Sequence, residues 1–509
     1  MDVVAVHAQA KPDAVAYVED ARRWTWRELF DRRNRLASSL TKLGLARGET
    51  AIVYAPNSLE YLLASGAVRA VNALPVPMNH RLVADEVLYI LDHSDAAVVF
   101  VGDPFVPIAE QVRSRAPNVR TWILTGAERR PWASSLDDLV QRGSPEAPAV
   151  DPTQGLGGSM IYTGGTTGKP KGALRSGVNP RLTLDLMQAL GMIHEGQVHL
   201  VAGPLYHSAP GSFALFTTVL GGTVVVMRKF EPEQALHLIH THRVTSTFMA
   251  PTLVKRILDL PEAVRARYDV ASMKSLVVAA APCPMRVKEE ALRYFGPCFY
   301  EFYGSTELGV NTILTPADVL RKPGSCGRAA PNVELALLDD DGRPVAVGEP
   351  GEVYIRRFEG MFDGYYKNAE ATSQTRRGEW YSVGDVARVD AEGYYYICDR
   401  KRDMIISAGV NIYPAEIEDA LHRHPAVEDV AVFGVPDEDW GERVHAAIQI
   451  RPGHTLTADE VRAFAREHLA DYKAPREVSF PDDFPRDTAG KLIKRMLRDP
   501  YWAGRDRTI

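Results

Sequence analysis

Residues 159–172 of the chain read SMIYTGGTTGKPKG, an apolar run that leads into a loop of glycines, hydroxyl side chains and two lysines. Glycines let several backbone N–H groups converge on one anion, hydroxyl groups donate further hydrogen bonds, and lysines neutralise negative charge. A charge-assisted hydrogen bond of this kind contributes about 1.5–3 kcal/mol. The loop is therefore predicted to follow a β-strand and to bind a triphosphate.

The loop does not match the common P-loop pattern GxxxxGK[ST]. Lys169 follows Gly168 as that pattern requires, but Thr163 stands at the first glycine position and Pro170 at the hydroxyl position. The alternative is an ordinary glycine-rich surface turn. The hydroxyl groups and two lysines in so short a stretch favour the phosphate site.

Short apolar runs alternate with amphipathic stretches on both sides of the loop, which is typical of α/β proteins. Trp24–Leu43 is predicted to be a helix with Leu29, Leu36, Leu40 and Leu43 on its apolar face. Strands are predicted at Thr50–Ala55, Ala97–Val101, Thr223–Met227 and Ser275–Ala279. This order predicts a large N-terminal domain of doubly wound, mostly parallel sheets.

The pattern changes from about Gly324. Predicted strands at Val333–Leu338, Gly351–Arg356 and Tyr394–Cys398, separated by turn residues, indicate an antiparallel, barrel-like part at about 324–398. After residues 399–403 (DRKRD), a helix at Pro414–His424 and two strands indicate a small α+β unit. We therefore predict a large domain at 1–399, a small C-terminal domain at 400–509, and a hinge at about 399–403.

The composition excludes several classes of protein. The chain has 509 residues, 45% of them hydrophobic, and its 59 basic and 65 acidic side chains give a formal charge of −6. This balance argues against binding nucleic acid or an anionic membrane through overall charge. Four cysteines without a CxxC pair predict neither a zinc site nor a disulfide framework, and favour the cytoplasm. The sequence shows neither a signal peptide nor a long apolar run, so no integral membrane segment is expected.

The loop at 159–172 resembles the phosphate loop of the adenylate-forming superfamily, which includes acyl-CoA synthetases, luciferases and peptide-synthetase adenylation domains. Many members have serine where this chain has Gly164, so one hydroxyl donor is missing. The resemblance runs from about residue 10 to 497. It implies that the following residues bind ATP: Thr163, Gly164, Gly165, Thr166, Thr167, Gly168, Lys169 and Lys171.

A second motif, YEFYGSTE at 300–307, resembles the YGxTE element of the superfamily. Aromatic side chains can stack on a purine, and hydroxyl and carboxylate oxygens suit Mg²⁺. The resemblance implies that Glu301 and Tyr303 contact ATP, and that Thr306 and Glu307 support the metal and catalysis. The alternative for this segment is a solvated turn after a strand.

Further matches concern the nucleoside. Asp385, in YSVGD at 381–385, resembles the aspartate that accepts hydrogen bonds from the ribose, and Arg400 resembles an arginine at the ribose or phosphate. Ala280 and Ala281 resemble the adenine-side segment, where small side chains let a flat ring approach the backbone. A turn at Asp385 and a plain strand end at Ala280 are the alternatives.

At the acid end of the site, PLYHS at 204–208 resembles the motif whose histidine borders the acyl group. We expect His207 to gate the pocket and not to act as a general base; a structural histidine is the alternative. By the same analogy the acyl pocket comprises His207, Met249, Ala280, Tyr303, Ser305, Val310 and Asn311. This mixture lacks an obvious cation for a second carboxylate, which favours a fatty or aromatic monocarboxylate.

The C-terminal unit resembles the mobile domain of the superfamily. FPRDTAGK at 484–491 resembles the last core motif and implies that Lys491 is catalytic, since a point charge on a flexible stem suits a reaction that builds charge at phosphorus. Arg402 stands where the superfamily commonly has an Asp or Lys pivot. Gly409 resembles a glycine that lines the pantetheine tunnel.

The resemblance implies an enzyme that uses ATP and Mg²⁺ to form an acyl-adenylate and then transfers the acyl group to coenzyme A. Trp440, Lys473 and Arg476, with Gly409, are the predicted CoA residues. An amide synthetase, a carrier-protein ligase and a non-catalytic nucleotide-binding protein stay open, and so does a homodimer. No GxSxG motif supports a serine hydrolase.

Overall fold

The structure is a computed structural model that describes residues 2–148, 158–163, 170–177, 179–401, 403–407, 410–437, 439–486 and 492–503. Several predicted site residues lie outside these ranges. They are Gly164, Gly165, Thr166, Thr167, Gly168, Lys169, Arg402, Gly409 and Lys491.

The first long helix, α2 (Trp26–Lys42), confirms the predicted amphipathic pattern. Leu29, Leu36 and Leu40 are at most 3% exposed and join the core. The helix begins two residues later than predicted because the Thr25 side chain accepts a hydrogen bond from the Glu28 N–H, and the Glu28 carboxylate accepts one from the Thr25 N–H. This capping box places the start of the helix after Thr25.

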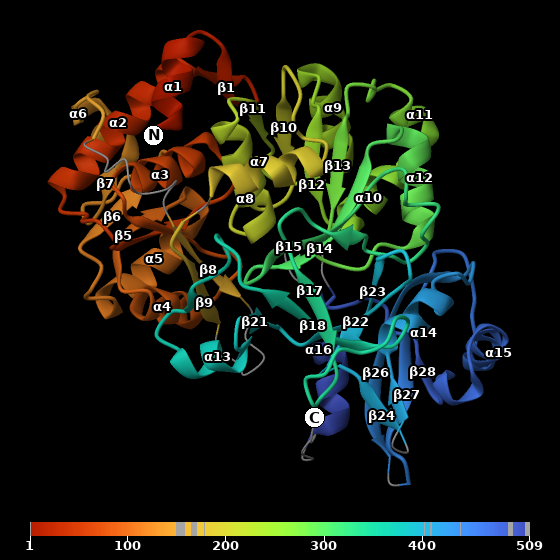
Figure 1. Ribbon diagram of the computed structural model, residues 1–509. Helices are drawn as coiled ribbons and strands as arrows, with labels where there is room; N and C mark the ends of the chain where they lie inside the picture. The colour runs from red at the N-terminus through yellow and green to blue at the C-terminus, as the bar shows by residue number, and fades with distance from the viewer. Residues whose placement is uncertain are drawn as a thin grey trace.

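One parallel sheet lies in the N-terminal part of the chain (Figure 1). Its strands, in spatial order, are β4 (Leu74–Pro77), β3 (Thr50–Tyr54), β5 (Ala96–Val101), β6 (Thr121–Leu124) and β7 (Ser134–Ser135). The central strands β3 and β5 are buried along their whole length. Burial on both faces explains why these strands are continuous apolar runs and not alternating ones.

The largest sheet among the described residues has nine strands. In spatial order they are β16 (Arg328–Ala329), β15 (Gly309–Leu314), β14 (Phe299–Ser305), β13 (Ser275–Val278), β12 (Ser246–Met249), β10 (Val198–Val201), β11 (Thr223–Val226), β1 (Val15–Glu19) and β2 (Arg22–Thr25). In this spatial order, neighbouring strands from β14 to β1 pair in parallel. Strand β15 runs antiparallel to β14. The carboxyl ends of β12, β13 and β14 therefore share one edge, where α/β proteins bind their ligands.

Helices cover both faces of this sheet. On one face lie α7 (Pro180–Ala189) and α8 (Ser208–Val219), with Met187 and Phe213 in the core between helix and sheet. On the other face lie α9 (Pro232–His242), α10 (Pro251–Leu258) and α12 (Met285–Phe295). The predicted α/β class with doubly wound sheets is confirmed.

An antiparallel sheet follows, as the turn-rich pattern after Gly324 predicts. Its strands are β17 (Leu335–Leu338), β18 (Gly351–Arg356), β20 (Arg376–Arg377), β21 (Trp380–Tyr381), β22 (Asp385–Val389) and β23 (Tyr395–Arg400). A separate small sheet joins β8 (Ser159–Thr163), β9 (Lys171–Arg175) and β19 (Gly364–Tyr365). Through β19, the chain after β18 pairs with β9, the strand that follows the glycine loop.

The C-terminal unit has its own sheet and core, drawn in blue in Figure 1. Its elements are β24 (Ile405–Ser407), β25 (Val410–Ile412), α14 (Pro414–Leu421), β26 (Val427–Asp437), β27 (Gly441–Ile450), α15 (Ala458–His468), β28 (Glu477–Ser479) and α16 (Lys494–Arg498). Since β23 ends at Arg400 and β24 begins at Ile405, the chain passes between the two sheets in the segment where we predict the hinge. Lys255 of α10 forms an ion pair with Glu428 of this unit, N to O 2.5 Å.

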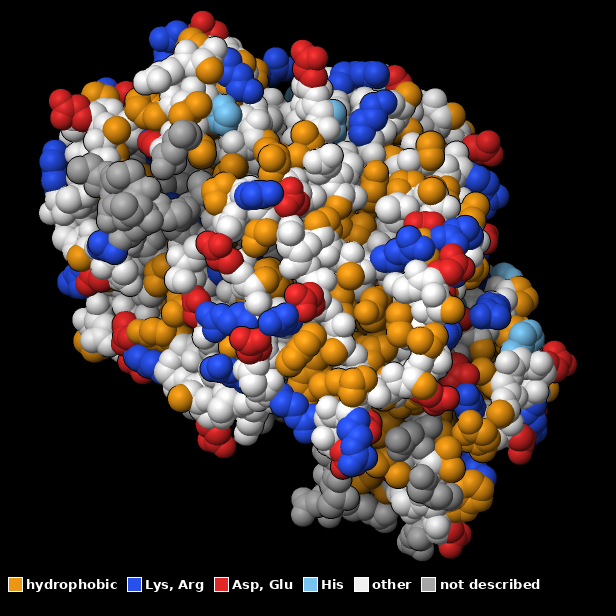
Figure 2. Space-filling view, in the orientation of Figure 1, with side chains coloured by type: hydrophobic (Ala, Val, Ile, Leu, Met, Phe, Trp, Pro, Cys, Tyr) orange, Lys and Arg blue, Asp and Glu red, His pale blue; other side chains and the backbone are white. Residues whose placement is uncertain are grey.

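Acidic and basic side chains are interspersed over the face drawn in Figure 2. In the part of the chain that the structure describes, no helix has the length and apolar character needed to cross a membrane.

Candidate active site

Glu307 lies where three segments of the chain meet, directly after β14. Its Oε1 accepts hydrogen bonds from Thr163 Oγ1 at 3.3 Å and from Tyr365 Oη at 2.9 Å. Thr163 ends β8 at the edge of the glycine loop, and Lys171 Nζ is 5.2 Å from the centre of the Tyr365 ring. The structure therefore places the predicted metal-associated glutamate against Thr163 and links it to Lys171 through Tyr365.

Arg175 contacts the backbone of the residue that precedes Glu307. Its guanidinium donates a hydrogen bond to the backbone oxygen of Thr306, 3.1 Å away. Burial lowers the pKa of Arg175, while Asp363 and Glu307 oppose the shift. Sequence reasoning missed Arg175 and Tyr365; an arginine four residues after Lys171, at the end of the strand that follows the loop, is the signal that could have drawn attention to Arg175.

Asp385 forms the centre of the predicted ribose site. One of its carboxylate oxygens accepts a hydrogen bond from Tyr303 Oη at 2.7 Å. The other forms an ion pair with Arg400, whose Nε lies 3.3 Å away. Burial, followed by the Asp385 charge, raises the pKa of Tyr303 well above its ordinary value, so the phenol stays protonated and donates. The antiparallel register Asp385↔Arg400 and the position of Tyr303 on β14 bring the three together.

Ala280 follows β13 at the same edge and has a backbone φ of +79°. Alanine seldom adopts such a conformation, and residues held there cluster at binding sites. Ala280 is exposed and Ala281 half-buried. The two alanines thus present small side chains at the edge where Glu307 and Asp385 lie.

His207 and Ser305 are the two polar residues at the ends of their elements that we predict at the acid end of the site. His207 caps α8, with its ring centre 4.3 Å from that of Tyr206, and Ser305 Oγ accepts the Leu308 N–H at 3.0 Å. Val310 packs with the core between α8 and the sheet. Asn311 is fully buried, and within the described residues its side-chain amide has no hydrogen-bond partner.

Met249, predicted in the acyl pocket, and Glu301, predicted at ATP, have their side chains in other surroundings. The Met249 side chain packs in the core on the opposite face of the sheet, because neighbours along a strand face opposite sides; Phe248 faces α8 in its place. Glu301 forms a buried ion pair with Lys288, and burial raises the pKa of Glu301 while Lys288 opposes that shift. The structure gives Glu301 this ion pair in place of a nucleotide contact.

The predicted CoA residues fall into two groups on the C-terminal unit. The Arg476 guanidinium carbon lies 3.5 Å from the centre of the Trp440 ring, which makes a stacked cation–π pair beside the β26–β27 turn. Lys473 instead forms an ion pair with Glu416 at 2.6 Å. The structure brings Trp440 and Arg476 together, whereas the Lys473 side chain is paired with Glu416 of α14.

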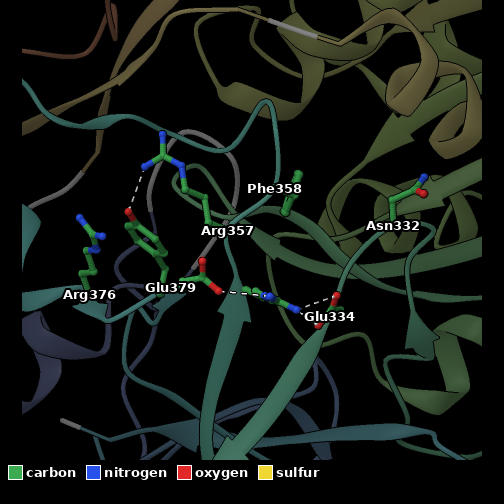
Figure 3. A pocket seen from close by; sticks show the side chains of 8 residues that line it. Asn332, Glu334, Arg357, Phe358, Arg376 and Glu379 are labelled. Atoms are coloured by element: carbon green, nitrogen blue, oxygen red, sulfur yellow. Dashed lines mark hydrogen bonds and ion pairs between the residues drawn. The ribbon is translucent and has the colours of Figure 1, made fainter.

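A separate polar pocket of about 400 Å³ opens on the antiparallel sheet (Figure 3). Arg356 in this pocket pairs with Glu334 at 3.1 Å and with Glu379 at 3.2 Å. Arg357 donates to Tyr381 Oη at 3.1 Å. None of the predicted site residues lines this pocket, and most of its charges are already paired.

Comparisons to known proteins agree with the contact of Thr163 with Glu307, the contacts of Asp385 with Tyr303 and Arg400, and the separate C-terminal unit. The chain matches the AMP-binding enzyme family over residues 4–366 and the AMP-binding enzyme C-terminal domain over residues 416–491. It belongs to the adenylate-forming superfamily. The chain is therefore an adenylate-forming, acyl-activating enzyme.

Two curated relatives of this adenylate-forming enzyme cover nearly all of it. Long-chain-fatty-acid–CoA ligase FadD13 of Mycobacterium tuberculosis is 33% identical over 97% of each chain, and feruloyl-CoA synthase of an Amycolatopsis species is 34% identical over 96% of each. Among solved structures, amide bond synthetase McbA from Marinactinospora thermotolerans superposes with a TM-score of 0.88 at 26% identity, covering 98% of this chain and 100% of McbA.

Replacing Asp385 with Asn is expected to raise the KM for ATP about 10-fold or more, because charged hydrogen bonds of about 1.5–3 kcal/mol are lost. The amide keeps the size of the side chain but loses the negative charge that faces Arg400. ATP-dependent pyrophosphate release at varied ATP concentration measures the effect. Asp340→Asn, at an exposed partner of Lys401, is the control. An unchanged KM in folded Asp385→Asn would contradict the ribose assignment.

Proposed function

We propose that this enzyme activates a fatty or aromatic monocarboxylate with ATP and transfers the acyl group to coenzyme A. The observation that carries the proposal is the grouping of Thr163, Lys171 and Glu307 around Tyr365. Asp385 accepts a hydrogen bond from Tyr303 of the neighbouring strand β14. In the first step a substrate carboxylate oxygen attacks the α-phosphorus of ATP, and the bond to the bridging oxygen breaks. The products are acyl-adenylate and pyrophosphate.

Mg²⁺ fits the donor set at Glu307. Mg²⁺ in nucleotide sites is usually held by one or two carboxylates together with substrate phosphates and water, so one buried glutamate suffices. Glu307 and Thr306 would hold it, and the ion would neutralise phosphate charge. Thr163 and Tyr365 fix the Glu307 carboxylate in one orientation, which is the contribution of this chain to that site.

In the proposed reaction the chain positions the reactants and supplies charge to them. Asp385 accepts hydrogen bonds from the ribose hydroxyls, and its position is fixed by Tyr303 and Arg400. Lys171 and the proposed Lys491 supply positive charge where negative charge develops at phosphorus. Preorganised charge of this kind is commonly the largest single contribution to catalysis.

Transfer to coenzyme A is the second half-reaction. The thiol sulfur attacks the acyl carbonyl carbon, AMP leaves, and the thiol proton is released to solvent. We propose that the small domain first turns at Arg402, which withdraws Lys491 and presents Gly409 to the pantetheine arm. A few hinge residues can absorb such a rotation.

Support for CoA as acceptor comes from the two CoA-using relatives and from the stacked Trp440–Arg476 pair, which offers a flat ring and a cation to a nucleotide phosphate. The main alternative is amide formation, which the similarity to McbA favours. A carrier-protein ligase also shares the first half-reaction. The discriminating experiment adds an acid, ATP and either CoA or an amine, and follows pyrophosphate, free thiol and amide. Thiol consumption supports the proposal, and amide formation without thiol consumption rejects CoA as acceptor.

Replacing Arg476 with Ala is expected to raise the KM for CoA about 10-fold, since one charged contact of about 1.5–3 kcal/mol is lost. Pyrophosphate release in the first half-reaction should not change. Arg423→Ala, at an exposed arginine of the same domain that pairs with Asp419, is the control. Equal KM values for CoA in the parent and in Arg476→Ala would remove this residue from the CoA site.

A further inference from the structure

Three phenylalanines lie together between α8 and the large sheet. The ring of Phe213, from α8, is stacked on that of Phe248, with centres 5.5 Å apart and planes 13° from parallel. Phe302 is 6.3 Å from Phe213 and 6.0 Å from Phe248. We call these three rings the aromatic floor.

The aromatic floor lies on the face of the large sheet that α8 covers, and Val310, one of the predicted acyl-pocket residues, packs in the same core. Phe302 lies one residue before Tyr303 on β14, and its partner across the sheet is Ile313. Phe248 lies opposite Val277, which pairs with Tyr300, so Phe248 is two residues farther than Phe302 from the carboxyl-end edge of the sheet. Two residues span about 6.6 Å along a strand, so the aromatic floor begins within a short distance of that edge.

The exposed fraction of the side chain differs among the three phenylalanines. Phe302 is half-buried, whereas Phe248 is 6% and Phe213 2% exposed. Val310, which packs in the same core, is also half-buried. Of the three rings, only Phe302 therefore keeps appreciable exposed surface.

A buried histidine lies next to the aromatic floor. The ring of His199 is stacked on Phe213, with centres 6.1 Å apart, and its Nδ1 lies 3.1 Å from Ser246 Oγ. His199 is 1% exposed, and burial lowers its pKa to about 3, so the imidazole is neutral. An alkyl chain that passed the floor would meet the buried imidazole of His199 and the packed apolar core that includes Met187.

We propose that Phe213, Phe248 and Phe302 close the acyl pocket, and that Phe213 limits the enzyme to acids with a single ring or a short chain. This inference rests on the proposed function, and it narrows the substrate class from fatty or aromatic acids to the smaller members of both. Long unbranched fatty acids are excluded because the rings occupy the path between α8 and the sheet.

The test is pyrophosphate release with single-ring aromatic acids and with unbranched acids from acetate to hexadecanoate. The parent is expected to use a single-ring or short acid at least about 100-fold better than hexadecanoate. Phe213→Ala removes the ring that closes the path, and each extra buried methylene is worth about fourfold in binding. We expect this variant to raise kcat/KM for octanoate, relative to the best short acid, by at least about 10-fold.

Phe295→Ala is the matched control, because Phe295 is 5% exposed and lies in the core on the opposite face of the sheet. It should lower the melting temperature without changing the ratio between acids. Phe213→Leu, a smaller change, keeps the test available if the alanine variant does not fold, and should shift the ratio in the same direction.

Preference of the parent for hexadecanoate, or an unchanged ratio in folded Phe213 variants, would overturn the proposal while leaving acid activation intact. Failure of every acid to release pyrophosphate would instead reject the proposed function. Thermal shifts produced by the same acids would then rank their binding: stronger shifts with short acids would uphold the aromatic floor, and stronger shifts with hexadecanoate would overturn it.

Discussion

Lys491→Ala should reduce acyl-adenylate formation by about 10²–10³-fold, the loss expected when one preorganised donor at a developing charge is removed. The ammonium group is proposed to reach the carboxylate and the α-phosphate only while adenylation takes place. Thioester formation from supplied acyl-adenylate should therefore stay near the parent rate. Single-turnover measurements of pyrophosphate and thioester separate the two steps.

Lys473→Ala is the control for this experiment. Lys473 is a lysine of the same domain whose charge is paired with Glu416, so its loss should leave adenylation nearly unchanged. If Lys491→Ala slowed both half-reactions equally, Lys491 would be a structural residue or would not leave the site.

Glu307→Gln is expected to lower turnover about 100-fold and to raise the magnesium concentration needed for half-maximal activity. Glutamine keeps an oxygen that can accept the hydrogen bonds from Thr163 and Tyr365, so the local structure should persist. What changes is the negative charge. A magnesium titration of pyrophosphate release measures the expected shift.

Glu334→Gln serves as the comparison, because Glu334 pairs with Arg356 in the polar pocket that no predicted site residue lines. Its magnesium titration should match that of the parent. A titration of Glu307→Gln that also matched the parent would rule out a role for Glu307 at the metal.

Much of the fold could be predicted because its signals are local. Thr25 and Glu28 are three residues apart, and a capping box needs nothing more to start a helix. The buried strand β5 is a continuous apolar run, which marks a strand covered on both faces. The turn-rich pattern after Gly324 likewise predicts antiparallel strands from short-range information.

The candidate site divides differently. The residue types at Thr163, Lys171, Glu307 and Asp385 could be selected by motif, because triphosphate chemistry restricts which side chains are useful. The partners of Glu307 could not, since Tyr365 reaches it only through the pairing of β19 with β9. That pairing joins segments nearly two hundred residues apart, and no local pattern encodes it.

The sequence alone thus determined the chemistry offered at the edge of the sheet and the order of helices and strands that builds the sheet. Tertiary structure decided which face each side chain occupies: Phe248 faces α8 while the neighbouring Met249 does not, and Glu301 turns to Lys288. Strand side chains alternate with a period of two, so moving the register by one residue exchanges every face. The register is set by packing among strands distant in sequence, and only the assembled sheet defines it.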